Sequence, residues 1–125
     1  MHASKAALSS LTTLKKRADF VAANQLNTKW VSQGLVIQIV PNDLGLKRVG
    51  YTVTKKTDKR AVVRNRIKRR LRAAAADVLP GKAKSGMDYI LIGRASTETR
   101  DYKQLCKDIT WCLGKLNCLE GQDAG

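Results

Sequence analysis

The feature that most constrains this chain is a strongly basic segment, residues 55–72, with the sequence KKTDKRAVVRNRIKRRLR. It holds ten of the chain's 24 lysines and arginines, and Asp58 is its only acid. Apolar residues nevertheless recur within and just beyond it at spacings of three and four: Val63, Ile67, Leu71, Ala74 and Val78. That spacing places them on one side of an α-helix. The segment therefore predicts a helix that packs along a narrow apolar stripe and presents cations elsewhere.

The polar side chains of this helix take positions that follow from about 100° of rotation per residue. With the stripe centred on Ile67, the outward positions are those of Asn65, Arg69 and Arg72. Arg66 and Lys68 lie on the flanks, and Arg64 and Arg70 lie beside the apolar edge. Cations four residues apart repel by a few tenths of a kcal/mol, and no acid between residues 59 and 76 offsets this. Arginine also suits phosphate oxygens. We therefore favour a polyanion-binding surface over an ordinary solvated face.

The whole chain has a composition that fits this interpretation. With 125 residues it is long enough for one domain with a modest core. Its formal net charge of +14 favours a nucleic acid over a small acidic substrate. The basic helix lacks the wide apolar face of a membrane-surface helix, and no apolar run reaches transmembrane length. The N-terminus lacks the apolar stretch of a secretory signal. We predict a cytoplasmic protein without a membrane partner.

Histidine and cysteine usage argues against catalysis by the protein itself. The only histidine is His2, near the N-terminus, which excludes a histidine base or a histidine metal site within the fold. Cys106, Cys112 and Cys118 are six residues apart, which is not a metal-ligand spacing. An odd number of cysteines without a disulfide framework is typical of free thiols in a reducing compartment. The sequence predicts no catalytic residue and no metal site.

The order of the predicted elements indicates the fold class. They are a helix over 16–26, a buried strand over 35–40, an alternating strand over 48–54, the basic helix from about residue 59 to Pro80–Gly81 with Thr57 or Asp58 as its N-cap, a buried strand over 88–93, and a helix over 101–116. This helix–strands–helix–strand–helix order predicts a single small α+β domain with one sheet covered by helices. We expect residues 1–13 to be disordered, residues 14–118 to form the domain, and residues 119–125 to form a loose tail.

Three segments resemble a known family. VGYTVTKK, RNRIKRRLR and DYILIGR, in this order and spacing, are similar to the protein subunit of bacterial ribonuclease P, over roughly residues 14–116. In that family a small basic protein pairs with a catalytic RNA that removes the 5′ leader of precursor tRNA. The resemblance implies a subunit of a ribonucleoprotein endoribonuclease whose chemistry, with Mg²⁺, belongs to the RNA. It also implies a left-handed βαβ crossover, although about 98% of such crossovers are right-handed.

The resemblance also implies two binding sites, with ribonuclease P RNA and precursor tRNA as partners and no protein partner required. The residues expected to contact phosphates of the catalytic RNA are Lys55, Lys56, Arg64, Asn65, Arg66, Lys68, Arg69 and Arg72. The residues expected to line or border a cleft for the leader are Phe20, Gln38, Thr52 and Arg94. Asn24 and Gln38 stand where the family commonly has aromatic residues, and aromatic side chains stack on RNA bases. We therefore expect the leader to be held mainly by cations, with weak sequence discrimination.

Two other classes of function compete with this interpretation. The chain could be another nucleic-acid-binding module, such as a ribosomal-type protein without a part in cleavage, or a DNA-binding protein. A helix-turn-helix protein would need a second helix a short turn from the basic one, and none is predicted. A protein-only nuclease would cluster carboxylates around two metal ions. The chain's ten acids are instead scattered along the sequence.

Overall fold

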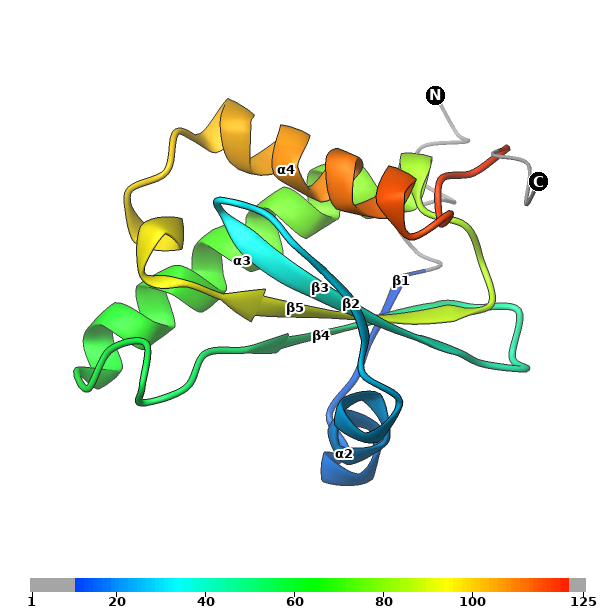
Figure 1. Cartoon of the computed structure of the whole chain (residues 1–125), viewed down its shortest axis with the longest axis horizontal. Coiled ribbons are helices and arrows are strands. Elements are labelled where there is room, and N and C mark those ends of the chain that lie inside the picture. Colours follow the sequence, from blue (N-terminus) through cyan, green and yellow to red (C-terminus); the bar gives the residue numbers. More distant parts are fainter. Residues whose placement is uncertain (1–10, 122–125) are drawn as a thin grey trace.

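The computed structural model describes residues 11–121, and residues 1–10 and 122–125 lie outside the described part, His2 among them. The elements in chain order are β1 (Leu11–Thr13), α2 (Arg17–Leu26), β2 (Thr28–Val31), β3 (Leu35–Pro41), β4 (Lys47–Thr52), α3 (Ala61–Lys82), β5 (Met87–Gly93), the 3₁₀ helix η1 (Ala95–Glu98) and α4 (Tyr102–Lys115). Figure 1 shows one sheet with α3 and α4 on one face and α2 on the other. The predicted α+β class, with a single sheet covered by helices, is confirmed.

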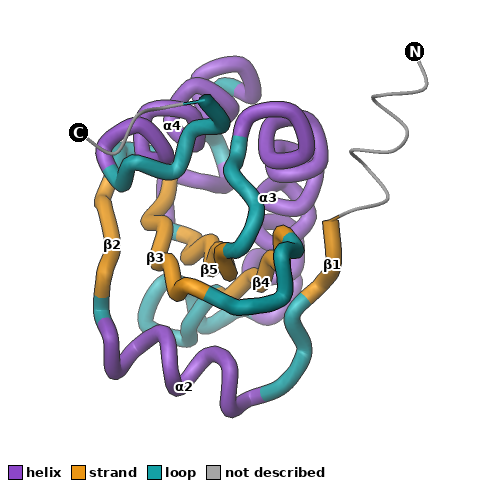
Figure 2. The backbone as a smooth tube through the Cα atoms, turned by 90° about the vertical axis from the view of Figure 1, so that its right-hand side faces the viewer, coloured by secondary structure: helices purple, strands orange, loops and turns teal. Residues whose placement is uncertain are grey.

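The sheet has five strands in the order β1-β4-β5-β3-β2. β4 runs parallel to both of its neighbours, β1 and β5, whereas β3 is antiparallel to β5 and to β2. The chain therefore passes from β4 through α3 to a parallel neighbouring strand. In Figure 2, β4 and β5 run away from the viewer, α3 lies above them and β5 lies left of β4. Seen along the strands as they run away from the viewer, the chain moves from β4 up to α3 and then left to β5, which is an anticlockwise turn. The crossover is therefore left-handed, as the family resemblance implied.

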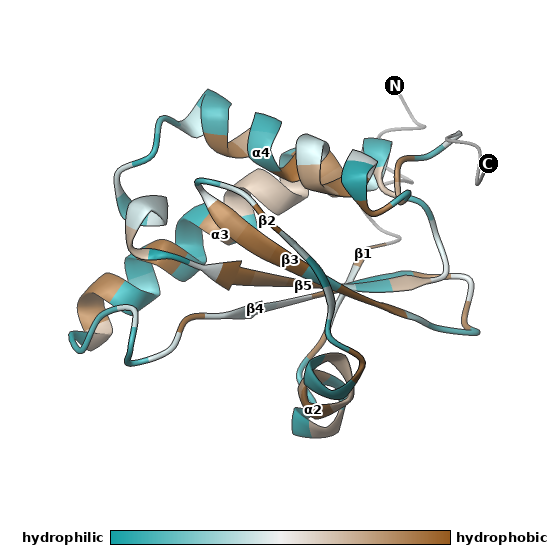
Figure 3. Cartoon of the chain, in the orientation of Figure 1, coloured by the Kyte–Doolittle hydropathy of each residue, from teal (hydrophilic) through white to brown (hydrophobic). Residues whose placement is uncertain are grey.

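The core lies between the sheet and the pair α3 and α4, and Figure 3 shows β3 and β5 as largely hydrophobic. All five residues of the predicted apolar stripe are buried there, which confirms the helical pattern: Val63, Ile67, Leu71, Ala74 and Val78. Ile67 and Leu71 face Gly93 at the end of β5. An added Cβ at Gly93 would lie 2.5 Å from Cγ2 of Ile67 and 2.8 Å from Cγ2 of Val53. Glycine at this position therefore allows α3 to lie close to the sheet.

Two predicted boundaries at the termini differ from the structure, while the rest of those segments, residues 1–10 and 122–125, lies outside the described residues. Leu11–Thr13, within the segment expected to be disordered, form β1, and Leu11 pairs with Lys47 of β4. A strand this short and mostly exposed has no pattern that sequence reasoning can detect. At the other end, Leu119 bridges to Ala83, and the Glu120 amide donates to the Lys82 carbonyl at 2.6 Å. The tail is thus attached to the end of α3 through at least residue 120.

A further strand, β2, was not predicted. Its four residues, Thr28–Val31, are all exposed and pair antiparallel with β3 along one edge of the sheet. The segment offers neither a buried run nor a clear alternation, because an edge strand outside the core needs neither. Its strand conformation comes from pairing with β3, and Trp30 also packs against Trp111 of α4. Among the described residues, no helix combines enough length and apolarity to cross a membrane.

The ends of α3 also differ from the prediction. The N-cap residue is Arg60, and the carboxylate of Asp58 accepts from the Arg60 amide at 2.8 Å instead of capping the helix. Pro80 does not end α3, which continues to Lys82. A proline in the last turn removes only its own amide bond. The buried ammonium of Lys47 donates to the Pro80 carbonyl at 2.6 Å and so binds one of the helix's terminal carbonyl groups.

The contact at Gly93 yields the first prediction. Gly93→Ala forces a methyl group against Ile67 and Val53, and such overpacking lowers the free energy of unfolding by about 1–3 kcal/mol. The control is Gly81→Ala in the last turn of α3, where an added Cβ meets no atom within 4 Å. This change should raise stability by about 0.5–1 kcal/mol. Urea denaturation of both variants measures the difference, and an unchanged midpoint for Gly93→Ala would contradict the proposed packing.

Candidate nucleic-acid interface

The cations of α3 are divided between two sides of the helix. On the side toward η1, Nη1 of Arg66 donates to Oε2 of Glu98 at 2.5 Å. Nε of Arg70 donates to the Thr97 carbonyl at 2.9 Å, and its Nη2 donates to the Arg100 carbonyl. These two arginines therefore hold η1 and the start of α4 against α3. Arg66, predicted to bind RNA, has an acidic partner within the fold, although its side chain is half exposed.

The remaining cations of α3 and of the loop before it are spread around the helix: Arg69 lines a hollow with Arg66, Arg70 and Glu98, whereas Arg72 lies toward β4. Within residues 11–121, no carboxylate lies within ion-pair distance of the following residues: Lys55, Lys56, Lys68, Arg69 and Arg72. The guanidinium of Arg72 lies 5.2 Å from the ring centroid of Tyr51, which directs it to the β4 side of the helix. Burial raises the pKa of Tyr51, and the positive charge of Arg72 opposes that rise. Tyr51 therefore stays neutral beside the cation at physiological pH.

The loop between β4 and α3 is held in place by one arginine of the basic helix. Nη1 of Arg64 donates to the carbonyls of Asp58 and Lys59 at 2.9 and 2.8 Å. Hydrogen bonds from Arg60 lower the pKa of Asp58 to about 2, so this carboxylate stays ionised and paired with Arg60. The interaction leaves Lys55 and Lys56 exposed next to the outward face of α3. Arg64 thus orders the loop, and Asn65 is exposed beside it.

Phe20 lies on the opposite face of the sheet, where α2 crosses it. Its ring packs on Gly50 of β4 so closely that an added Cβ would lie 2.7 Å from Cζ of Phe20. The ring is half-buried and packs against a small cluster of Leu14, Ala23 and Ile90. The predicted open face of the strand over 48–54 is therefore covered at Gly50. Phe20 combines a packing role with an exposed edge.

That exposed edge borders a shallow hollow. Its volume is about 340 Å³, and its lining residues are Lys15, Arg17, Phe20, Tyr51 and Thr52. Phe20 and Thr52, two of the predicted cleft residues, are thus brought together. Sequence reasoning missed Lys15 and Arg17 as members of this site. The basic run just before α2 was the available signal, and the fold places it next to the aromatic ring.

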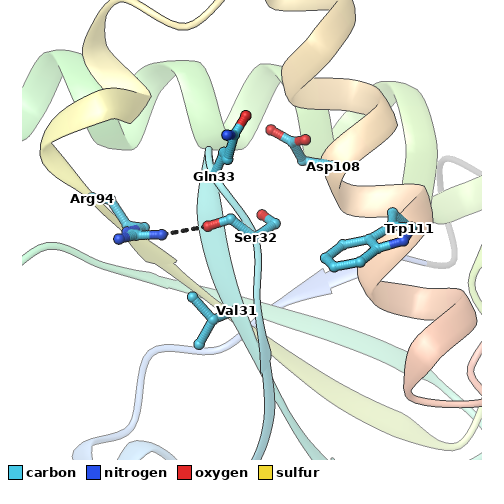
Figure 4. A pocket seen from close by; sticks show the side chains of 6 residues that line it. All are labelled: Val31, Ser32, Gln33, Arg94, Asp108 and Trp111. Atoms are coloured by element: carbon cyan, nitrogen blue, oxygen red, sulfur yellow. Dashed lines mark hydrogen bonds between the residues drawn. The ribbon is translucent and has the colours of Figure 1, made fainter.

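The other two predicted cleft residues lie elsewhere. Gln38 is 4% exposed, and its Nε2 lies 3.5 Å from Oδ1 of Asn27, so its side chain links β3 to the end of α2 and does not line the hollow. Arg94, just after β5, donates from Nη1 to the Ser32 carbonyl at 2.5 Å. It borders a second hollow, which Trp111 lines on the other side, as Figure 4 shows. Asn24 is exposed on α2, one turn beyond Phe20.

The described residues offer little for covalent or metal chemistry. Burial raises the pKa of all three thiols, that of Cys112 to about 11, so the cysteines stay protonated at neutral pH and are poor nucleophiles. No group of three or more histidine, cysteine, aspartate or glutamate side chains within residues 11–121 is placed to hold a metal ion. The arrangement of these residues is suited to binding an anionic polymer.

Comparison with known proteins supports the same conclusion. The sequence model of the family described as Ribonuclease P matches residues 8–117 of this chain. The ribonuclease P protein component of Paramagnetospirillum magneticum is 44% identical over 115 residues, which cover 88% of this chain and 86% of the relative. That of Ruegeria pomeroyi is 41% identical over 115 residues, covering 89% and 90%.

Solved structures have the same fold. The Staphylococcus aureus RNase P protein superposes with a TM-score of 0.69 at 25% identity, covering 85% of this chain and 95% of that one. The RNase P protein from Thermotoga maritima, at 22% identity, superposes with a TM-score of 0.67 over 83% and 94%. With the basic helix, the left-handed crossover and the sequence match in agreement, the chain belongs to the bacterial ribonuclease P protein family, the protein components of a ribonucleoprotein endoribonuclease.

Proposed function

We propose that this chain binds ribonuclease P RNA through the outward side of α3 and the loop before it. The carrying observation is that Lys55, Lys56, Lys68, Arg69 and Arg72 have no acidic partner within residues 11–121. Such a surface repels itself in the free protein and is neutralised by phosphates in the complex. Arg64 contributes indirectly because it holds the loop that carries Lys55 and Lys56.

We further propose that the α2 side of the sheet holds the 5′ leader of precursor tRNA. Phe20 offers an aromatic edge beside Thr52, and Lys15 and Arg17 supply cations for the leader's phosphates. Since Asn24 offers no ring and Gln38 is buried, the hollow has few groups that read bases. Phosphate contacts position a nucleic acid, whereas base contacts specify its sequence. Weak discrimination among leader sequences follows from this composition.

The chemistry in this proposal belongs to the RNA subunit. Mg²⁺ held by the RNA activates water at the scissile phosphate, and the protein positions the substrate. We infer that the protein acts in the cytoplasm, together with its RNA partners. The competing hypothesis of a ribosomal-type protein without a part in cleavage predicts binding to RNA but no effect on tRNA maturation.

Reconstitution tests this proposal directly. The protein with Mg²⁺ alone should leave precursor tRNA intact, because the described residues include neither a reactive thiol nor a metal-holding cluster. A bacterial ribonuclease P RNA with the protein should release the leader at a Mg²⁺ concentration too low for the RNA alone. Gel analysis of the 5′ end measures both reactions. Cleavage by RNA-free protein at the holoenzyme's rate, or no stimulation of the RNA, would contradict the proposal.

The outward side of α3 yields a prediction about salt dependence. Replacing Lys68, Arg69 and Arg72 together by Gln should weaken binding to ribonuclease P RNA. The slope of log affinity against log salt should become shallower by about 0.7–0.9 per lost phosphate contact. The free energy of unfolding should change by about 0.5 kcal/mol or less per substitution, because these side chains lie outside the core.

A matched control removes the same charge from another surface. Lys82, Lys103 and Lys107 are exposed at the end of α3 and on α4, and their replacement by Gln should leave a steeper slope than the α3 variant. Binding titrations at several salt concentrations measure both variants, and thermal melting checks their folds. Equal slopes in the two variants would show that only net charge matters and that α3 is not the contact surface.

Phe20 is tested by a variant that preserves packing. Phe20→Leu keeps an apolar side chain against Gly50 and Ile90 but removes the aromatic ring, and stacking on a base contributes about 1–3 kcal/mol. The holoenzyme should bind precursor tRNA more weakly while its affinity for mature tRNA stays nearly unchanged, because only the precursor has a leader. Paired titrations with the two ligands measure this difference. An equal loss for both would mean that Phe20 serves packing alone.

A further inference from the structure

Trp111, which lines the second hollow, belongs to an aromatic pair that the function proposed so far does not use. Trp30 of β2 and Trp111 of α4 are the chain's only two tryptophans. Their ring centroids lie 6.0 Å apart at an interplanar angle of 74°. Nζ of Lys115 lies 6.0 Å from the first centroid and 5.9 Å from the second. One ammonium group thus contacts both rings, an arrangement that cation–π attraction favours.

This pair is open to solvent to an unusual degree. Trp30 is 38% exposed and Trp111 is 50% exposed, although α4 has a buried side available. If Trp111 served only to cover the core, burial of its large ring would favour a more enclosed position. An exposed indole beside a cation is instead typical of surfaces that stack nucleic-acid bases. The pair therefore has the chemistry of a base-binding site.

The hollow next to Trp111 has a volume of about 340 Å³. Figure 4 shows Arg94 on one side of it and Trp111 on the other, with the backbone of Val31, Ser32 and Gln33 between them. Because β2 is an edge strand, its outer side has no neighbouring strand. Asp108, the acid that lines the hollow, is paired with Arg100 through two hydrogen bonds at 2.8 and 3.2 Å. The positive charge of Arg100 therefore offsets the negative charge of Asp108 beside an incoming phosphate.

Arg94 lies on the leader side of the sheet, and the pairing of β4 with β5 shows this. Thr52 of β4 pairs with Ile92 of β5, and Arg94 follows two residues later. Since side chains alternate along a strand, Thr52, Ile92 and Arg94 emerge on the same face. Val31, 50% exposed, is on this face too, because its partner Val36 alternates with the core residues Leu35 and Ile37. A strand of RNA leaving Phe20 and Thr52 therefore meets Arg94 and then the edge of β2.

We propose that the hollow between Arg94 and Trp111 is a second subsite for the 5′ leader, in which an unpaired base stacks on Trp111 and an adjacent phosphate binds Arg94. Lys115, one helical turn beyond Trp111, adds positive charge at the outer end. This inference rests on the proposed leader function and extends the leader's path around the β2 edge. A protein segment is the competing occupant, but the cations at both ends favour an anionic strand.

The test uses reconstituted holoenzyme and precursor tRNAs whose leaders are lengthened one nucleotide at a time, with mature tRNA as reference. For the wild type, affinity should rise in a step at the leader length that reaches Trp111. Trp111→Leu keeps an apolar side chain beside Trp30 but cannot stack as an indole does, and it should remove the step. The loss should be at least about fivefold for long leaders, with little change for short ones. Trp111→Phe should retain most of the step.

A matched control comes from the same helix. Tyr102 is also an exposed aromatic residue of α4, but it lies in the first turn and its hydroxyl donates to Asp77 of α3. Tyr102→Leu should leave the step in place. Thermal melting of each variant should show that the fold is retained, so that a loss of affinity reports on the subsite itself.

The outcomes separate this inference from the function on which it rests. If Trp111→Leu binds like the wild type at every leader length, the subsite does not exist and a protein segment becomes the better occupant. If Trp111→Leu lowers the affinity for mature tRNA by the same factor as for the precursor, Trp111 contacts the catalytic RNA or the tRNA body, and the inference is wrong. A leader-specific loss with Phe20→Leu but not with Trp111→Leu overturns only this subsite. No leader-specific loss with either variant overturns the leader proposal as well.

Discussion

The packing of α3 against β4 and β5 is the contact on which the rest of this structure depends. In its cation-bearing half, residues 61–72, the helix buries only Val63, Ile67 and Leu71, and Gly93 allows Ile67 to lie close to the sheet. Because that line of side chains is buried, every cation of the helix must lie on a flank or point outward. The same contact that builds the core thus produces the charged surface. Separating α3 from β4 and β5 would disrupt the core and the charged surface together.

The two flanks of α3 have different roles because of what lies beside them. Toward η1, Arg70 donates to backbone carbonyls and Arg66 donates to Glu98, which holds η1 and the start of α4 against α3. Toward β4, Arg72 faces the ring of Tyr51, and toward the preceding loop, Arg64 donates to backbone carbonyls. The cations without an acidic partner in the described residues therefore lie on the outward side of α3, toward β4, and at Arg69 beside the Arg66–Glu98 pair. On the opposite face of the sheet, Gly50 provides the space in which the ring of Phe20 can pack.

Sequence reasoning succeeded where a pattern is long or a segment is buried on both faces. The stripe from Val63 to Val78 and the apolar runs of β3 and β5 are of this kind, and the structure has them as predicted. It failed for β1 and β2, which are short edge strands with mostly exposed side chains. Their conformation comes from hydrogen bonds to a neighbouring strand, and no local pattern records such a partner.

The candidate site divides in the same way. The sequence by itself determined that a helix would carry a dense set of cations on its outer surface, because periodicity and charge are local properties. Only the tertiary structure decided which of them are available: Arg66 meets Glu98 from 32 residues away, and Arg64 turns back to bind its own loop. It also buried Gln38 and placed Arg94 across a hollow from Trp111. Such pairings depend on distances between segments remote in sequence, which are established only when the chain packs.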